Sequence, residues 1–421
     1  MHRFFKSEFF NFEFLRILST TRYGGCEIGE ALEAAAQIKD GDPHSWSTQW
    51  SLLSTKAEEL SKEAQKAGDT ITAHNVLLRA SNYRRASQYM LNAPDPTEAA
   101  LAVTRLEKSE ALFKQALLLQ EGVMVHELAI PYGKGIHLPA YLYVPTQFEK
   151  SKGIPLVINL SGGDSTQEEM FVVSACAGPP RGYAVLTFEG PGQGILLKWE
   201  RLPMEPAYEK VTSTVLDFLE HNNSSDHANY GLDLNRIAVV GQSMGGYFAL
   251  RAAADQRVKA CIAVDPPYDM WDLALSRMPG WFMGGWVRGI ITDSVFKWTV
   301  GLLSNLNYQL KWEVAHLQAM SGADNAADAF RFLKQLTLKN ADGSEYLRNV
   351  KCPVLVTAPT NAMYFDLEVN SKKIFATLDH MEDGKREYWV PDTLYEGGLQ
   401  AKVCAFELAN YRIFGWCDKH L

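Results

Sequence analysis

The most constraining feature of the sequence is a serine flanked by glycines, placed between an apolar run and a segment suited to a helix. The β-branched residues 237–240 lead into the motif G-x-S-x-G, formed by Gly241, Ser243 and Gly245. Residues 247–254 can continue as a helix, so the order predicts a strand, a sharp turn and a helix with the serine at the turn. Glycine on either side leaves room where the turn tolerates little side-chain bulk. We therefore predict that Ser243 is presented as a nucleophile; an ordinary glycine turn is the alternative.

Size and composition are those of a globular protein. The length of 421 residues suggests two or three folded units. The hydrophobic content of 47% and the charged content of 21% are typical of a globular protein. The net charge of −8 at pH 7 argues against nucleic acid or an anionic membrane as a partner. The cysteines lack C-x-x-C spacing, so we expect buried thiols in a reducing compartment, with no disulfide framework and no metal site. They are Cys26, Cys176, Cys261, Cys352, Cys404 and Cys417.

The first 15 residues are rich in phenylalanine but are interrupted by Lys6, Glu8 and Glu13. They lack the continuous apolar stretch and the cleavage site of a signal peptide. No segment reaches the roughly 18 apolar residues that span a bilayer. We therefore expect a cytoplasmic protein with no membrane partner. The aromatic start is expected to pack against the body of the protein or a second subunit, because its exposure would favour aggregation.

Residues 1–120 are predicted to form a helical N-terminal region. Asp69 and the pair Asp95-Pro96 stand where helix starts are expected. Apolar residues recur at spacings of three and four, the period of a helix with one buried face. The segments with this spacing are residues 31–38, 46–67, 70–91 and 97–119.

From about residue 121 the pattern becomes that of a β-sheet with intervening helices. Residues 123–130 and 137–144 alternate around a Gly-Lys-Gly turn and predict an antiparallel pair. Short apolar strands then alternate with helices, as in a mostly parallel sheet. These strands are expected at residues 155–160, 184–188, 236–240, 260–264, 354–357 and 387–390. Together with the serine motif they predict an α/β-hydrolase fold, with its core at residues 121–265 and 335–421.

Residues 266–334 are predicted to be an insertion that follows the strand after the serine, where hydrolase folds carry a helical lid. An aromatic lid suits a large hydrophobic small-molecule substrate. The alternative is that the aromatic residues fill a helical core. The tryptophans concerned are Trp271, Trp281, Trp286, Trp298 and Trp312.

Two glycine-rich loops follow predicted strands. The first contains Gly162, Gly163 and Asp164, and in this fold the corresponding loop donates one amide of an oxyanion hole. The residue after the nucleophile, here Met244, donates the other; a plain turn is the alternative for the first loop. The second loop, residues 188–194, lacks a following helix with a P-loop lysine, so we expect it to shape the substrate rim.

These motifs in this order resemble one hydrolase family. The helical N-terminal region, the Gly-Gly-Asp-Ser loop, Glu-Gly-Pro-Gly-Gln-Gly at residues 189–194 and Gly-Gln-Ser-Met-Gly-Gly at 241–246 are similar to pseudooxynicotine-type carbon–carbon hydrolases and fungal heptaketide hydrolases. Residues 395–402 resemble the branch found in fungal polyketide–peptide clusters of the fusarin and cytochalasan type. The resemblance covers nearly the whole chain and implies the hydrolase fold and a homodimer formed through the N-terminal region.

The sequence departs from the hydrolytic members at two positions. Those relatives carry an acid after the penultimate core strand and a histidine after the last one. Here Asn361 stands where the aspartate aligns, and residues 390–401 contain no histidine. The resemblance therefore implies an incomplete or relocated Ser-His-Asp triad.

Five other residues are candidates for the missing acid or base. Asp366 lies five residues beyond Asn361, and Asp392 and Glu396 occupy the loop that normally holds the histidine. His316 lies in the predicted lid and could reach over the serine, and His380 lies before the last strand. A solvated turn is the alternative for Asp392 and Glu396, and a structural role is the alternative for His316.

The motifs leave three functions open. A serine without a base is a poor nucleophile, whereas an oxyanion hole stabilises an enolate as readily as a tetrahedral adduct. We favour, by a small margin, a cyclising carbon–carbon condensation of a polyketide–amino acid intermediate that forms a pyrrolinone or pyrrolidone ring. The alternatives are a serine hydrolase of an ester, thioester or acyl carbon–carbon bond, and a non-catalytic binding module. No cofactor is expected for any of the three.

Overall fold

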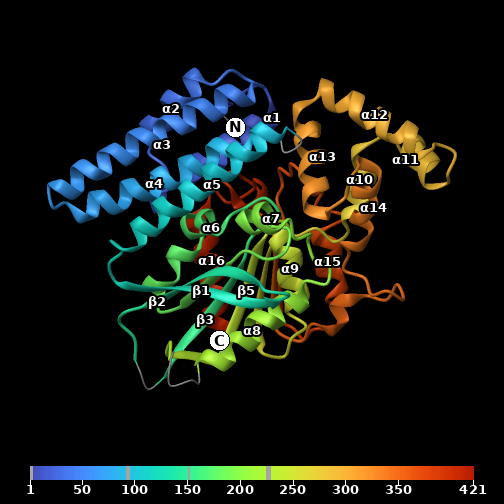
Figure 1. The fold of residues 1–421 in the computed structure, drawn as a ribbon. Coiled ribbons are helices and arrows are strands. Elements are labelled where there is room, and N and C mark those ends of the chain that lie inside the picture. The colour runs from blue at the N-terminus through green and yellow to red at the C-terminus, as the bar shows by residue number, and fades with distance from the viewer. Residues whose placement is uncertain (1–2, 92–94, 150–151, 224–228) are drawn as a thin grey trace.

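The computed structural model describes residues 3–91, 95–149, 152–223 and 229–421, and it is built around one eight-stranded sheet (Figure 1). The strand order is β1-β2-β4-β3-β5-β6-β7-β8. β1, β2 and β4 pair in antiparallel fashion, and all later neighbours pair in parallel. The strands are β1 (Val123–Gly133), β2 (Ile136–Pro145), β3 (Ile154–Leu160), β4 (Ala184–Phe188), β5 (Leu232–Gln242), β6 (Val258–Val264), β7 (Val354–Thr357) and β8 (Arg386–Trp389). All eight strands expected from the sequence are confirmed.

The central strands read as unbroken apolar runs because helices cover both faces of the sheet. Every residue of β4 and β7 is buried, as are the last six of β5, as expected for parallel strands. The helices between strands are α6 (Gln167–Val173), α7 (Gly194–Glu200), α8 (Glu209–Asn223), α9 (Met244–Ala252) and α15 (Ser371–Thr377), and α16 (Phe406–His420) ends the chain. The six cysteines are free thiols, four of them buried.

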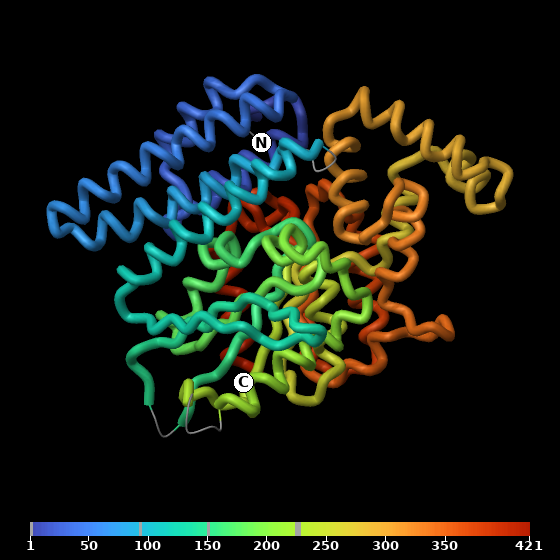
Figure 2. The backbone as a smooth tube through the Cα atoms, in the orientation of Figure 1, coloured from blue at the N-terminus to red at the C-terminus, as the bar shows by residue number. Residues whose placement is uncertain are grey.

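Five helices precede the sheet and lie over one end of it, in blue in Figures 1 and 2. Asp69 and Asp95 cap the last two of them, and proline follows Asp95 directly, which confirms both expected starts. The phenylalanine-rich segment is itself a helix whose aromatic rings are buried against Trp46 and Trp50. The five are α1 (Glu8–Leu18), α2 (Ile28–Gln37), α3 (Pro43–Lys66), α4 (Thr70–Tyr89) and α5 (Pro96–Leu117).

A second group of helices, in orange, lies beside the first above the same end of the sheet (Figure 1). Its tryptophans have different roles: Trp286 stacks on Phe296 with ring centroids 3.9 Å apart, whereas Trp281 and Trp298 are 74% and 68% exposed. Trp312 joins the two groups, because its indole N–H donates to the Tyr89 carbonyl at 2.6 Å. The helices are α10 (Met270–Arg277), α11 (Gly280–Val287), α12 (Asp293–Leu306), α13 (Tyr308–Ser321) and α14 (Ala326–Phe332). Within the described part of the chain, none of the helices has the length and apolar character needed to cross a membrane.

A buried glutamate ties two loops near the serine motif to the sheet. Glu189 follows β4, is 1% exposed, and accepts hydrogen bonds from the amides of Gln167 at 3.1 Å and Ile195 at 2.6 Å. Burial, with the neighbouring Glu168 carboxyl, raises the pKa of Glu189 to about 8. The folded protein therefore holds a proton that the unfolded chain releases above the ordinary glutamate pKa of 4.5.

We predict that this carboxyl makes the protein less stable as the pH rises. Its contribution is fully present below about pH 4.5 and is lost as the pH rises through about 8. Glu189→Gln keeps the side chain neutral, so this variant should gain stability relative to the wild type between pH 5 and pH 9. Urea unfolding at several pH values measures the difference. Glu121→Gln, at an exposed position, is the control, and a pH-independent difference for Glu189→Gln would contradict the prediction.

Candidate active site

Ser243 lies at a strained turn between β5 and α9. Its backbone angles are φ 57° and ψ −122°, a conformation that non-glycine residues adopt only when the surrounding structure enforces it. The Ser243 amide donates to the Val264 carbonyl at 2.8 Å, which ties the turn to the end of β6. A Cβ atom at Gly241 would overlap the Gly245 carbonyl, and one at Gly245 would overlap the Leu160 carbonyl. Both glycines of the motif are therefore required by close backbone contacts.

The glycine loop after β3 lies directly against this turn. A Cβ atom at Gly163 would be 3.6 Å from the Met244 Cγ, and one at Gly162 would be 3.5 Å from the Gln242 carbonyl oxygen. Met244 is the first residue of α9, so its amide has no acceptor within the helix. The glycine loop is therefore in contact with the first residue of α9, and an oxyanion hole between them stays a prediction from the sequence.

Three separate parts of the chain hold the glycine loop in place. From α13, His316 pairs its Nε2 with the Gly163 carbonyl at 3.1 Å. From the residue before α7, Gln193 donates its amide to the carbonyls of Ser161 at 2.8 Å and Gly162 at 3.0 Å. The second glycine-rich loop, which contains Gln193, is thus hydrogen-bonded to the first loop.

Asp164 is the third attachment point, and it is held by the N-terminal helices. Its Oδ2 accepts from Arg16 Nη1 at 2.8 Å and from the Tyr89 hydroxyl at 2.6 Å. Burial alone would raise the pKa of Asp164, but Arg16 and Tyr89 hold it well below its usual value. The Asp164 side chain is therefore an ionised anchor for the loop, and its ion pair with Arg16 accounts for most of that stabilisation.

Ser243 opens onto two cavities. The larger, of about 180 Å³, lies under α10 and α13 and has mainly apolar walls. The smaller, of about 60 Å³, lies between α1 and the loop after β8. Gly163, Asp164 and Met244 line the larger cavity together with Met270, Leu273, Met278, Leu310, Trp312, His316, Met320, Phe330 and Tyr364. Gln242, Gly162, Asp164 and Tyr364 line the smaller one together with Glu13, Arg16, Gln400 and Ala401.

Two residues of the loop after β8, Gln400 and Ala401, line the smaller cavity together with Ser243. Gln400 is 1% exposed and its Oε1 accepts from the amides of Met363 at 3.1 Å and Tyr364 at 2.8 Å. Ala401 follows with φ 56°. Among the described residues, no hydrogen bond joins the Ser243 hydroxyl to an imidazole. His316 shares the larger cavity with Ser243, but its Nε2 is held by Gly163.

The other candidate acids and bases lie away from both cavities. Asp366 is exposed and accepts from the amides of Glu368 and Val369, so it serves a turn. Glu396 accepts from the Thr393 hydroxyl at 2.7 Å, and Asp392 is exposed in the same loop. His380 pairs with the Val350 carbonyl at 3.0 Å. The structure does not bring these four side chains into either cavity: Asp366, Glu396 and His380 have local partners, and Asp392 lies in solvent.

The family model described as "Alpha/beta hydrolase family" matches residues 162–392, which include the glycine loop, the serine turn and helices α10 to α14. The chain belongs to the alpha/beta hydrolase family. This membership confirms the fold predicted from the serine motif and the strand pattern.

Relatives from fungi match the whole length of this hydrolase. It is 46% identical to alpha/beta hydrolase psoB of Aspergillus fumigatus, with 100% of this chain and 94% of that protein covered. It is 41% identical to 20-hydroxy-prefusarin hydrolase FUS2 of Gibberella moniliformis, with 99% and 98% covered. The solved structure of 2,6-dihydroxy-pseudo-oxynicotine hydrolase has a TM-score of 0.69, with 21% identity and 96% and 95% of the two chains covered. The expected resemblance to fungal and pseudo-oxynicotine-type hydrolases is confirmed.

A buried ion pair lies at the carboxyl ends of β6, β7 and β8, next to the loops in which the sequence analysis sought an acid and a histidine. Lys402 Nζ contacts Asp265 Oδ1 at 2.7 Å, and the two side chains are 1% and 0% exposed. Lys402 also donates to the Ala358 carbonyl at 3.1 Å, and Thr357 donates its hydroxyl to Asp265 at 2.6 Å. Burial lowers the pKa of Lys402, and Asp265 opposes that shift. The pair joins the loops after β6, β7 and β8 and so fixes Gln400 and Ala401 beside the serine.

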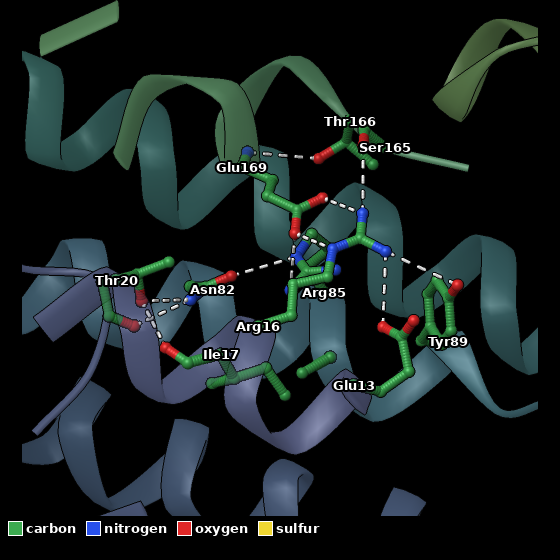
Figure 3. A network of polar contacts seen from close by, with 12 residues as sticks. Glu13, Arg16, Ile17, Thr20, Asn82, Arg85, Tyr89, Ser165, Thr166 and Glu169 are labelled. Atoms are coloured by element: carbon green, nitrogen blue, oxygen red, sulfur yellow. Dashed lines mark hydrogen bonds and ion pairs between the residues drawn. The ribbon is translucent and has the colours of Figure 1, made fainter. Parts of the chain in front are cut away.

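Sequence reasoning missed the ionisable groups Glu13, Arg16 and Glu169, which line the smaller cavity together with Ser243. Glu13 on α1 lines the smaller cavity together with Ser243, although 230 positions separate them. It belongs to a cluster with Arg16, Arg85 and Glu169 (Figure 3). The only available signal was a glutamate between Phe12 and Phe14, an acid inside an otherwise aromatic helix.

We predict that the Lys402–Asp265 pair is strongly coupled. Lys402→Met leaves Asp265 buried without a cation and should lower the free energy of unfolding by about 3–5 kcal/mol. The double variant Lys402→Met/Asp265→Asn leaves no buried charge and should recover much of that loss. Guanidinium unfolding of the wild type, both single variants and the double variant measures the coupling. A double-variant loss equal to the sum of the single losses would contradict it.

Proposed function

We propose that this hydrolase-fold protein is an enzyme of fungal secondary metabolism that closes a ring on a polyketide–amino acid intermediate by carbon–carbon condensation at Ser243. The observation that carries the proposal is the pairing of Ser243 with Gln400 and Ala401 in one cavity, where hydrolytic relatives are expected to place an imidazole. The intact serine turn and glycine loop keep an oxyanion site without the usual base. Relatives from fungi, one of them named for 20-hydroxy-prefusarin, support the substrate class.

The condensation needs an anion-stabilising site more than it needs a nucleophile. The substrate is an amino aldehyde whose nitrogen carries a β-ketoacyl chain. The methylene between the two carbonyls loses a proton, and the resulting enolate carbon bonds to the aldehyde carbon. The aldehyde oxygen becomes an alkoxide, takes a proton, and leaves as water with the second methylene proton, which gives a pyrrolinone. In this proposal the amides of Met244 and Gly163 and the Ser243 hydroxyl donate to that alkoxide.

The cavity walls suit the rest of such a substrate. Met270, Met278, Met320 and Phe330 line the 180 Å³ cavity, and flexible methionine side chains adapt to irregular apolar chains. Excluding water from an apolar site protects a reactive aldehyde and strengthens hydrogen bonds to a developing anion. A polyketide chain in this cavity would place its reactive end at Ser243, where the polar groups are.

A serine hydrolase is the second candidate, and His316 favours it. Burial lowers the pKa of His316, so the ring is neutral at pH 7. The Gly163 carbonyl can only accept a hydrogen bond, so Nε2 carries the proton and Nδ1 is the basic nitrogen. His316 and Ser243 line the same cavity, and a rotation of the lid side chain would bring a base toward the serine.

We predict that a fluorophosphonate reacts slowly with Ser243, because this probe needs a serine that a base activates. Labelling followed by gel fluorescence or mass spectrometry measures the rate. Ser344→Ala, in an exposed loop, is the control for the serine substitution. Rapid labelling of the wild type that is lost in Ser243→Ala and in His316→Ala would instead establish the hydrolase.

We also predict that Ser243→Ala slows ring closure of a synthetic N-(β-ketoacyl) amino aldehyde by about 10²–10³-fold, the effect of losing one oxyanion donor. Loss of a true nucleophile costs about 10⁶-fold, so the size of the effect separates the two candidates. Product formation by liquid chromatography measures it. Full turnover in Ser243→Ala would remove the serine from the mechanism.

A further inference from the structure

The wall of the smaller cavity opposite Ser243 carries a carboxylic acid from the N-terminal region. Glu13 lies in the middle of α1, and its side chain is only 4% exposed. It faces the same 60 Å³ cavity as Ser243, Tyr364 and Gln400. The first helix of the chain therefore contributes directly to the space beside the serine.

Glu13 belongs to a buried cluster that contains more carboxyl groups than arginines. The cluster contains two buried cations, Arg16 and Arg85, and three carboxyls. Arg16 donates to Glu169 through Nε and Nη2, both at 2.6 Å (Figure 3). It also donates to Asp164 at 2.8 Å. Arg85 also contacts Glu169, at 3.3 Å. Arg16 therefore makes its shortest contacts with Glu169 and Asp164, and Arg85 donates its Nε to Asn82 at 3.0 Å.

Arg16 contacts Glu13 at a longer distance than it contacts Glu169 or Asp164. Its Oε2 is 3.3 Å from Arg16 Nη1, the nitrogen that already donates to Asp164. Burial raises the pKa of Glu13 to about 7; Arg16 opposes the shift, and Asp164 and Glu169 add to it. Tyr89 of α4 and Tyr364 of the loop after β7 complete the surrounding ionisable groups, and burial raises the pKa of both phenols well above its usual value. Neither tyrosine therefore competes with Glu13 for protons near neutral pH.

We propose that Glu13 is a catalytic residue that exchanges protons with the substrate in the Ser243 cavity, in place of the imidazole that the loop after β8 lacks. The inference rests on the proposed condensation and deepens it. The cavity that the two side chains share carries the argument, together with the charge excess that leaves Glu13 without a full ion pair. A general base works best when it gains and loses its proton near the working pH.

The proton steps balance with one carboxyl. The Glu13 carboxylate takes a proton from the methylene between the two carbonyls, and the C–H electron pair becomes the enolate that bonds to the aldehyde carbon. The carboxylic acid then returns its proton to the alkoxide, which forms a hydroxyl. In the elimination Glu13 takes the second methylene proton and gives it to the leaving hydroxide. One water is released and Glu13 ends as a carboxylate.

The experiment measures removal of the methylene proton separately from formation of the carbon–carbon bond. The probe is an N-(β-ketoacyl) amino alcohol, which carries the activated methylene but no aldehyde. Exchange of its methylene hydrogens in D₂O is followed by proton NMR with the wild type, Glu13→Gln, Glu13→Asp and Glu8→Gln. Glu8 lies on the same helix and its side chain is 77% exposed, so Glu8→Gln is the matched control. Calorimetric binding of the probe and thermal melting report whether each variant is folded.

We expect the wild type to accelerate exchange, with a rate that rises with pH through about 7. Glu13→Gln should lose at least about 10²-fold of the enzyme-dependent rate and the pH dependence, while it still binds the probe. Glu13→Asp should keep a reduced rate with a pH dependence, and Glu8→Gln should match the wild type. If Glu13→Gln unfolds, the pH dependence retained in Glu13→Asp decides the inference, and its absence overturns it.

Two further outcomes separate this inference from the proposed function. Ring closure of the aldehyde substrate at the wild-type rate by Glu13→Gln would overturn the role of Glu13 and leave the condensation intact. Absence of both exchange and ring closure in the wild type would overturn the condensation itself, and the role of Glu13 with it.

Discussion

The buried guanidinium of Arg16 is the interaction on which the rest of the site depends. It lies on α1, yet its partners Asp164, Ser165 and Glu169 belong to the loop and helix that follow β3. A guanidinium removed from water is tolerated only when charge-assisted hydrogen bonds satisfy it. Arg16 therefore fixes the N-terminal helices to the glycine loop, and through that loop to the serine turn.

The surroundings of Ser243 are consequently assembled from three parts of the chain. The sheet provides the Ser243 turn, α13 holds the Gly163 carbonyl through His316, and α1 holds Asp164 through Arg16. A strained serine conformation persists only where the surroundings enforce it. Here the end of β6 and the close backbone contacts at Gly241 and Gly245 hold the turn. The buried Lys402–Asp265 pair adds a further contact, because it ties the loop that carries Gln400 to the end of β6.

Local sequence patterns predicted the parts of this structure that depend on interactions between residues close together in the chain. The strands, the helix starts at Asp69 and Asp95 and the serine turn follow from periodicity, capping and glycine spacing. The glycine loop was found because its position after β3 is a property of the fold. His316 was named as a lid residue, and the structure places it in the serine cavity.

The residues that could not be predicted are those set by long-range charge pairing. Asp366, Asp392 and Glu396 are close to the expected positions in sequence, but their carboxyls satisfy turns or remain in solvent. Glu13 lies far away in sequence and reaches the cavity because α1 packs across the end of the sheet. No periodicity encodes such a contact, and it became visible only when the partners of Arg16 were known.

The most direct test of the central claim is whether Ser243 ever becomes covalently acylated during turnover. Rapid-quench mass spectrometry of the intact protein, mixed with an N-(β-ketoacyl) amino aldehyde, follows the mass of the enzyme from milliseconds to completion. The account predicts an unchanged protein mass while the pyrrolinone accumulates. A transient mass increase equal to the acyl group, absent in Ser243→Ala, would contradict it and identify an acyl-enzyme.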